Sequence, residues 1–233
     1  MNKQEHGTMP FFADPLKILA SAVGITIAVL AVVLKAHPLM VLPLFVSVVI
    51  SFLQARVNRY CFLIGAVNAI FYAVAYYIMT LYSTAAYALL ISFPLQALTF
   101  ITWSKKTVDG KTETRKMSAK LRLCFVGGMI ATWLLLFFIF RSLDSEYLII
   151  DNTITVIGIV GTVIATMRFA EYAFIKVVSD CINAVLYAIM AFSDASKTVW
   201  LIFTLYSATC ALIAFIKMTR SKKETQNDRQ AYS

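Results

Sequence analysis

The amino-acid sequence predicts an all-α polytopic membrane protein, and three observations lead to that fold class. Hydrophobic residues make up 60% of the 233-residue chain, whose mean hydropathy is +0.77. Charged residues make up 14%, whereas about a quarter is usual in soluble domains. Several apolar runs have the roughly 20 residues that a helix needs to cross a bilayer. One membrane domain therefore accounts for most of the chain.

Eight apolar runs are predicted to cross the membrane. The second is the weakest, because it is short, carries Pro43 and follows the first closely, so a re-entrant or kinked helix is the alternative there. Pro94 predicts a kink in the fourth span, where neighbouring helices can take up the freed carbonyl. The predicted spans are Leu16–Leu34, Leu39–Leu53, Tyr60–Met79, Thr84–Trp103, Leu123–Phe140, Tyr147–Met167, Phe169–Phe192 and Thr198–Met218.

The net charge of +9 follows the membrane topology rather than a nucleic-acid surface. With the N-terminus inside, the basic loop Lys105–Arg122 and the basic tail both fall inside, while the outer side receives only Lys35, Arg141 and Lys197. This positive-inside pattern predicts a plasma-membrane protein with both termini in the cytoplasm. A basic loop at the lipid surface explains the charge without RNA or DNA. No metal-ligand spacing joins the cysteines and histidines, so we expect no cofactor.

Short internal matches predict a duplicated unit. Asn68–Ala73 (Asn-Ala-Ile-Phe-Tyr-Ala) recurs as Asn183–Ala188 (Asn-Ala-Val-Leu-Tyr-Ala), an offset of 115 residues. The pattern Arg-x-x-x-Tyr at Arg56–Tyr60 recurs at Arg168–Tyr172, an offset of 112, and the two offsets exclude each other as one structural register. A single span between two three-span units makes those units parallel. We therefore expect 3+1+3 transmembrane helices as parallel triple-helix repeats plus an extra N-terminal helix.

The predicted segments follow from that division. They are an N-terminal segment with the extra helix (1–37), a first triple-helix repeat (38–104), a basic cytoplasmic loop with a linker helix (105–145), a second repeat (146–218) and a polar cytoplasmic tail (219–233).

The seventh span carries polar groups at the depth of the membrane. Lys176, Asp180, Asn183 and Tyr187 are spaced so that they form one stripe along a helix. A bare carboxylate at mid-membrane is costly. Two interpretations stay open for Asp180: an ion pair with Lys176 that fixes the packing, or a contact to a solute, proton or cation.

A matching stripe occupies the third span, where Asn68, Tyr72 and Tyr76 share one helix face. Gln96 in the fourth span is a further pore-lining candidate. Trp103 directly precedes a run of lysines and is predicted to be an interfacial anchor. Amides and aromatic rings on facing helices suit a flat, uncharged or cationic, hydroxyl-rich ligand.

Taken together, these motifs resemble the PnuC family of vitamin transporters, relatives of the SWEET sugar carriers, from about Leu39 to Met218. Two departures occur: the family often has Glu-Asn-Trp-x-x-Trp where this chain has Glu171–Lys176, and often has Gly-Trp where this chain has Thr102-Trp103. The residues that carry the resemblance are Gly65-x-x-Asn68, Leu81-Tyr82, Pro94-Leu95-Gln96 with Trp103, the linker Lys105–Arg122, Asp151, and Arg168-x-x-Glu171 with Asp180.

The resemblance implies facilitated uptake of nicotinamide riboside, or of thiamine, riboflavin or deoxynucleosides as in sister groups. It implies a homotrimer, no ATPase, and trapping of the solute by a cytoplasmic kinase. A substrate-binding subunit with an ATPase partner and a non-transporting sensor are the alternatives, while an intramembrane enzyme is disfavoured because no catalytic motif is present. The implied contacts are Asn68, Gln96, Asp180 and Asn183 as polar groups, with Tyr72 and Tyr187 as aromatic walls.

Overall fold

The computed structural model describes residues 14–105, 107–108, 111–112, 117–143, 147–169 and 171–231. Within them, eight helical segments are long and apolar enough to cross a membrane, which confirms the predicted all-α polytopic fold. A two-residue antiparallel hairpin, β1 with β2, is a small addition after the fourth span. The elements are α1 (Pro15–Val33), α2 (Pro38–Ala55), α3 (Tyr60–Ile78), α4 (Tyr82–Tyr87), η2 (Ala88–Ser92), α5 (Phe93–Ser104), β1 (Thr107–Val108), β2 (Lys111–Thr112), α6 (Ala119–Phe140), η3 (Arg141–Leu143), α7 (Leu148–Thr166), α8 (Glu171–Ser193), η4 (Ala195–Lys197) and α9 (Thr198–Ala231).

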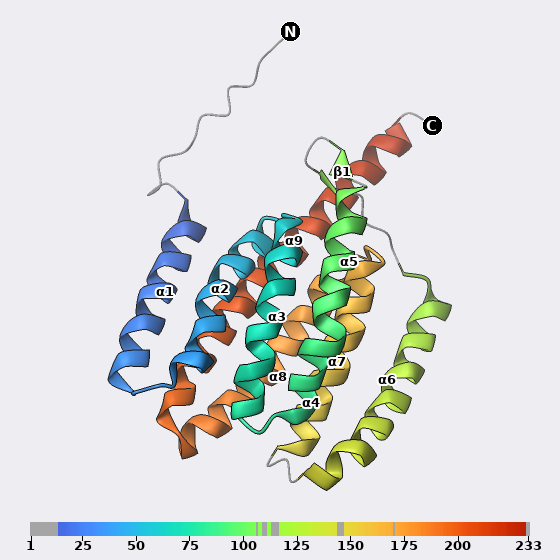
Figure 1. Ribbon diagram of the computed structural model, residues 1–233. Helices are drawn as coiled ribbons and strands as arrows, with labels where there is room; N and C mark the ends of the chain where they lie inside the picture. Colours follow the sequence, from blue (N-terminus) through green and yellow to red (C-terminus); the bar gives the residue numbers. More distant parts are fainter. Residues whose placement is uncertain are drawn as a thin grey trace.

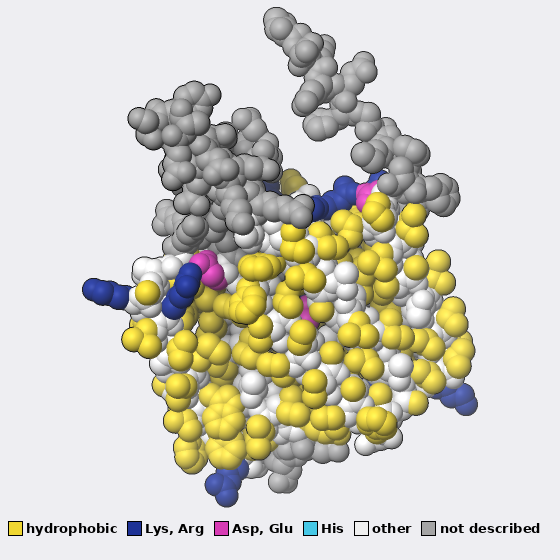
Figure 2. Space-filling view, turned by 180° about the vertical axis from the view of Figure 1, so that it is seen from behind, with side chains coloured by type: hydrophobic (Ala, Val, Ile, Leu, Met, Phe, Trp, Pro, Cys, Tyr) yellow, Lys and Arg dark blue, Asp and Glu magenta, His cyan; other side chains and the backbone are white. Residues whose placement is uncertain are grey.

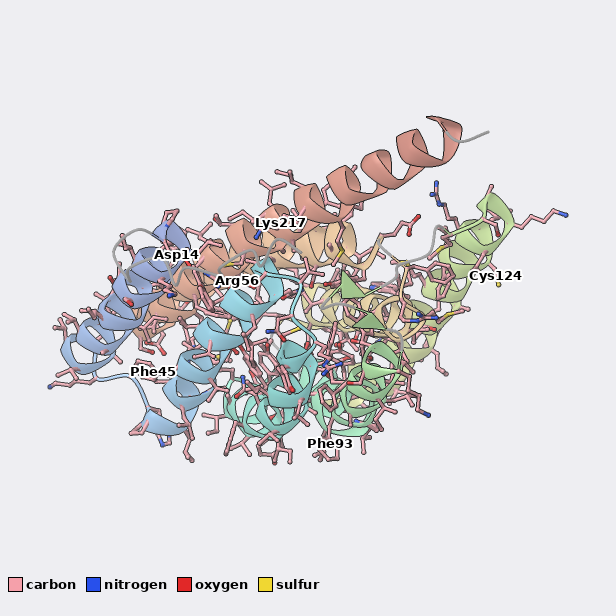
Figure 3. The ribbon with its side chains drawn as sticks, turned by 90° about the horizontal axis from the view of Figure 1, so that it is seen from above. Asp14, Phe45, Arg56, Phe93, Cys124 and Lys217 are labelled. Atoms are coloured by element: carbon pink, nitrogen blue, oxygen red, sulfur yellow. The ribbon has the colours of Figure 1, made fainter. Side chains whose placement is uncertain are left out.

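Six of the spans close into a ring. Going around it, α2 packs on α3, α3 on α5, α5 on α7, α7 on α8, α8 on α9, and α9 returns to α2. Helix α1 packs outside the ring on α2 and α9, and α6 packs outside it on α7. Viewed along the bundle, α1 and α6 lie at opposite edges of the molecule (Figure 3). This neighbour order agrees with two parallel halves, α2–α5 and α7–α9, although the repeat itself stays a prediction.

Three spans differ in detail from the sequence-based expectation. Helix α2 is a continuous helix with Pro43 inside it, so the re-entrant alternative is wrong. The fourth span is interrupted by the π-helix η2, which ends two residues before Pro94, where the missing N–H of a proline breaks the regular hydrogen-bond ladder. Helix α9 continues to Ala231, beyond the predicted end of its span at Met218.

A left-handed residue followed by the same closing hydrogen bond ends four of the described helices, and two of these corners occupy comparable places in the two halves. After α2, Val57 has φ 58° and the N–H of Asn58 donates to the carbonyl of Leu53 at 3.0 Å. After α7, Arg168 has φ 61° and the N–H of Phe169 donates to the carbonyl of Ile164 at 3.1 Å. Both are helix ends closed by a left-handed residue. Val57 and Arg168 are 111 residues apart, which is one residue less than the 112-residue offset of the Arg-x-x-x-Tyr match.

The surface fits a bilayer. Its sides are broadly apolar, with Lys and Arg toward the edges of the apolar face (Figure 2). Helix α1 begins, α9 ends and β1–β2 lies at one end of the bundle, here called the hairpin end (Figure 1). At that end Asp14 pairs with Arg56, and Lys217 donates to the carbonyl of Ala55 at 2.9 Å, which ties α1 and α9 to α2 (Figure 3).

Candidate functional site

The six spans of the ring enclose one polar cavity. It offers about 260 Å³ to water-sized molecules, and every span of the ring contributes to its wall. Among its lining residues, Lys176 is the one base and Asp180 the one acid, and the remaining polar groups are hydroxyls, amides, a thiol and the indole of Trp200. A space near the lower end of the usual range for ligand sites, roughly 300 Å³, suits a small molecule.

One wall, from α2 and α3, is a chain of hydrogen bonds centred on Asn68. The Asn68 amide nitrogen donates to the Pro43 carbonyl at 3.0 Å and to the Ser47 hydroxyl at 2.8 Å. The Ser47 hydroxyl is in turn 2.7 Å from the Tyr72 hydroxyl. Asn68 is 1% exposed, and its Oδ1 has no hydrogen-bond partner among the described residues. A buried acceptor without a partner is costly, so a donor from a bound molecule would stabilise it.

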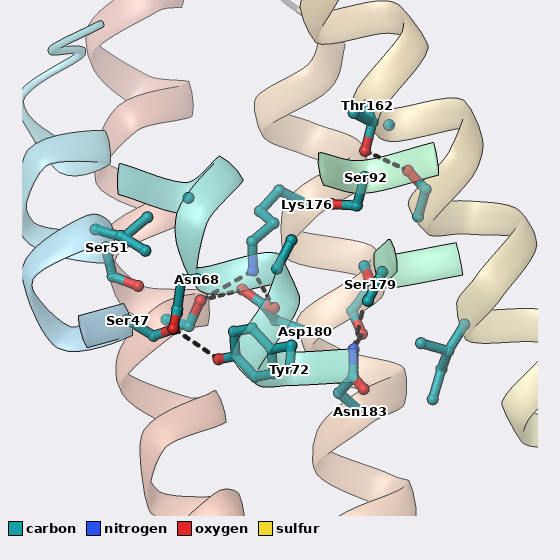
Figure 4. A pocket seen from close by; sticks show the side chains of 18 of the residues that line it. Ser47, Ser51, Asn68, Tyr72, Ser92, Thr162, Lys176, Ser179, Asp180 and Asn183 are labelled. Atoms are coloured by element: carbon teal, nitrogen blue, oxygen red, sulfur yellow. Dashed lines mark hydrogen bonds and ion pairs between the residues drawn. The ribbon is translucent and has the colours of Figure 1, made fainter. Parts of the chain in front are cut away.

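The opposite wall, from α8 and α9, carries the two charges (Figure 4). Lys176 pairs with Asp180 one helical turn away and also donates to the Ser207 hydroxyl at 2.9 Å. That hydroxyl donates to Asp180 Oδ2 at 2.9 Å. Of the two interpretations left open for Asp180, the ion pair is therefore present. Asn183 donates to the Ser179 carbonyl at 2.9 Å, which leaves its carbonyl oxygen for other partners.

Gln96 enters the cavity from α5, and its place depends on Gly65 of α3. Its amide nitrogen donates to the Ser92 hydroxyl at 2.7 Å. Its Oε1 lies so close to α3 that a Cβ on Gly65 would meet it at 2.0 Å. The absence of a side chain at Gly65 thus makes the room for Gln96.

Aromatic rings line the cavity at the end away from the hairpin. Trp200 of α9 lies 5.2 Å from Tyr187, 5.6 Å from Tyr76 and 5.7 Å from Tyr72, measured between ring centroids. Tyr72 and Tyr76 stack at 5.2 Å. Such rings offer both π faces and hydroxyl groups to a flat ligand.

A second aromatic cluster lies at the hairpin end. Phe62 lies 4.9 Å from Trp103 and 6.1 Å from Tyr172, between ring centroids. Trp103 is fully buried and donates to the Ala165 carbonyl at 2.9 Å, so its prediction as an interfacial anchor is wrong. Its position beside Lys105 suggested the lipid surface, but the packing of α5 on α7 buries it.

The cavity brings all six predicted site residues together. Asn68, Tyr72, Gln96, Asp180, Asn183 and Tyr187 all line it. Sequence reasoning missed polar residues on α2 and α9 whose spacing matches the stripe of α8. The steps of four and three residues recur on α2 and, counted from Trp200, on α9, and the missed residues are Ser47, Ser51 and Gln54 on α2, and Thr204 and Ser207 on α9.

Comparisons with known proteins agree with this architecture. A family model described as "Nicotinamide mononucleotide transporter" matches residues 37–220. No curated protein matches the chain. Among solved structures, the "Crystal structure of the Vitamin B3 transporter PnuC" is similar with a TM-score of 0.76 and 18% identity over 94% of each chain. At that identity the likeness supports the fold.

Proposed function

This chain belongs to the nicotinamide mononucleotide transporter family, and from that membership we propose that its cavity carries a vitamin B3 nucleoside across the membrane. Nicotinamide riboside is the leading solute, as the resemblance to PnuC proteins implies. The observation that carries the proposal is a cavity at mid-span whose wall includes Asn68, a buried amide whose Oδ1 has no hydrogen-bond partner among the described residues. A ribose hydroxyl or a carboxamide N–H is the kind of donor that this acceptor lacks.

Each predicted site residue takes a role in this proposal. Asn68, Gln96 and Asn183 contact the polar edges of the solute, and Asp180 contributes through its pair with Lys176. Tyr72 and Tyr187 are the aromatic walls against which a flat ring stacks.

Transport proceeds by alternating access in this proposal, because a solute at mid-membrane needs a route to each side in turn. The aromatic cluster around Trp200 closes one route, and the cluster of Phe62, Trp103 and Tyr172 closes the other. Flux follows the solute gradient without an ATPase, and a cytoplasmic kinase traps the riboside as its phosphate.

The proposed setting is the plasma membrane with both termini in the cytoplasm. The positive-inside pattern supports it, because the basic loop and the basic tail lie on one side in the predicted topology. A homotrimer is proposed from the resemblance alone.

Uptake of labelled nicotinamide riboside into liposomes that contain the purified protein tests the proposal. We expect saturable uptake that falls at least about tenfold in Asn68→Ala, the loss expected when a buried hydrogen bond to the solute is removed. Asn152→Ala is the matched control, because Asn152 is equally buried but does not line the cavity.

The alternative solutes are tested in the same vesicles. Saturable uptake of thiamine, riboflavin or a deoxynucleoside, and not of the riboside, would replace the proposed solute. Binding without flux of any of them would favour a subunit that needs an ATPase partner. If none of these solutes is bound or transported, the transporter proposal is ruled out.

A further inference from the structure

The two members of the charged pair in the cavity differ in how accessible they are to a solute. The side chain of Asp180 is 6% exposed, and both of its oxygens are occupied, Oδ1 by Lys176 and Oδ2 by Ser207. The side chain of Lys176 is 36% exposed and lines the cavity. The part of the pair that a solute can reach is therefore the ammonium group.

Lys176 has one donor to spare. An ammonium group has three N–H donors and no acceptor, and the described residues supply two partners, Asp180 and Ser207. In Figure 4 its Nζ points into the cavity, where Asp180 lies beside it and Asn68 and Ser47 lie across from it. A third partner from a bound molecule would have to be an acceptor.

The aromatic rings at the end away from the hairpin suit a cation, but the surroundings of Lys176 do not. The lining residues include no second acid to balance a cationic solute next to Lys176. They do include the hydroxyls of Ser51 on α2 and Ser179 on α8, whereas those of Thr162 and Thr204 donate to carbonyls of their own helices. Hydroxyls around one ammonium group suit a carboxylate or a phosphate, because hydrogen bonds to ionised groups are the stronger ones.

We propose that Lys176 is a specificity residue that selects, among vitamin B3 compounds, those carrying an anionic group, a carboxylate or a phosphate. The inference rests on the proposed function and, within vitamin B3 compounds, moves the preferred solute from nicotinamide riboside to an anionic relative of it. Asp180 and Ser207 position the ammonium group. The aromatic cluster around Trp200 lies nearer the other end of the cavity and takes the ring of the same solute.

Calorimetric titration of the full-length protein in detergent tests this with three solutes. Nicotinamide mononucleotide differs from nicotinamide riboside by a phosphate, and nicotinic acid riboside differs from it by a carboxylate in place of the carboxamide. We expect at least one anionic solute to bind about tenfold more tightly than nicotinamide riboside. The two comparisons identify which anion is recognised.

Lys176→Gln is expected to bring the ratio between the affinities for the anionic solute and for nicotinamide riboside close to one. The affinity for nicotinamide riboside itself should change by less than about threefold. Lys176→Arg should keep the preference. Lys197→Gln is the matched control, because Lys197 pairs with Asp194 and does not line the cavity. Lys176→Gln leaves Asp180 without its counter-ion. The double variant Lys176→Met with Asp180→Asn removes both charges, and we expect it to stay folded.

Three results would overturn the inference. They are equal affinity of the wild-type protein for all three solutes, tighter binding of the cationic riboside that is lost in Asp180→Asn, and an anion preference that survives in both Lys176 variants that lack the charge. Each leaves a vitamin B3 transporter in place. Binding of none of the three solutes overturns the proposed function together with the inference.

Discussion

At Gly65 the backbone of α3 lies directly against the side-chain amide of Gln96. A methyl group there would stand 2.0 Å from Gln96 Oε1, well inside contact distance. Gly65→Ala should therefore push Gln96 out of its bond with Ser92 and out of its place in the cavity. We expect solute uptake to fall by about tenfold, with the fold kept because a glutamine side chain can turn aside.

Gly24→Ala is the matched control for this prediction. Gly24 also lies within a transmembrane helix, but a Cβ there meets nothing within 4 Å. An alanine in a helix is favoured over glycine by about 1 kcal/mol, so this variant should melt at the same temperature or higher and transport normally. Wild-type uptake by Gly65→Ala would show that Gln96 has no part in binding.

Individual residues were predictable where helical spacing alone decides which face they occupy. Asn68, Asp180 and Asn183 lie on polar stripes, and every member of such a stripe must find a polar surrounding in a membrane. The serines of α2 carry the same spacing but little hydropathy signal, so Ser47 went unpredicted. Trp103 could not be placed, because a tryptophan at a helix end suits both a lipid interface and a seam between helices.

Among the elements, α4 depends on a residue from the other half of the chain. Asp151 of α7 is fully buried and accepts hydrogen bonds from the N–H groups of Ser83 at 3.0 Å and Thr84 at 3.1 Å, at the first turn of α4. A carboxylate at that position satisfies two otherwise unpaired donors. Asp151→Asn keeps the shape but replaces one acceptor with a donor. We expect about 2 kcal/mol of lost stability, seen as a melting temperature lower by roughly 5 °C in detergent.

Asp194→Asn is the control for Asp151→Asn. Asp194 also accepts from a helix-start N–H, that of Ser196 at 2.9 Å, but its side chain is 52% exposed. Water can replace the lost bond there, so the loss should stay within about 0.5 kcal/mol. Equal melting temperatures for the two variants would contradict the role given to the buried carboxylate.

The existence of each span was predictable, because length and hydropathy suffice for that. The details inside a span were not. Pro94 predicted a kink, yet the irregularity is the π-helix Ala88–Ser92 before it, which packs against α3 and α7. Likewise the α3 and α8 starts, Tyr60 and Glu171, differ by 111 residues, an offset that neither short sequence match contains.

On the scale of the whole molecule, the two halves meet along two unequal seams. Along the seam of α4 and α5 with α7, hydrogen bonds run from one end to the other. They join Thr84 with Thr155 at 3.1 Å, Tyr87 with Thr162 at 2.6 Å and Thr99 with Thr166 at 2.7 Å. Along the seam of α2 with α9, the described residues show Tyr206 bonded to the Val48 carbonyl at 3.1 Å and Lys217 bonded to the Ala55 carbonyl.

Because hydrogen bonds between buried groups are costly to break without replacement, the seam of α5 with α7 should stay fixed while the seam of α2 with α9 opens during transport. Spin labels at exposed positions measure this directly. One pair, Val49 with Ile216, spans α2 and α9, and the other, Ile101 with Met167, spans α5 and α7. The exposed thiols Cys124 and Cys181 are first replaced by serine.

On adding a saturating transported solute, we expect the distance distribution of the α2–α9 pair to shift or broaden by several ångströms, as in rigid-body rocking of packed units. The α5–α7 pair should keep its distribution, because a rocking motion leaves its hinge unchanged.

Lys217→Met, which removes the Ala55 bond, should shift the α2–α9 pair even without solute, since that bond holds the seam closed at the hairpin end. A change confined to the α5–α7 pair would reverse the assignment of hinge and opening. Equal changes in both pairs would mean that the halves separate without a hinge.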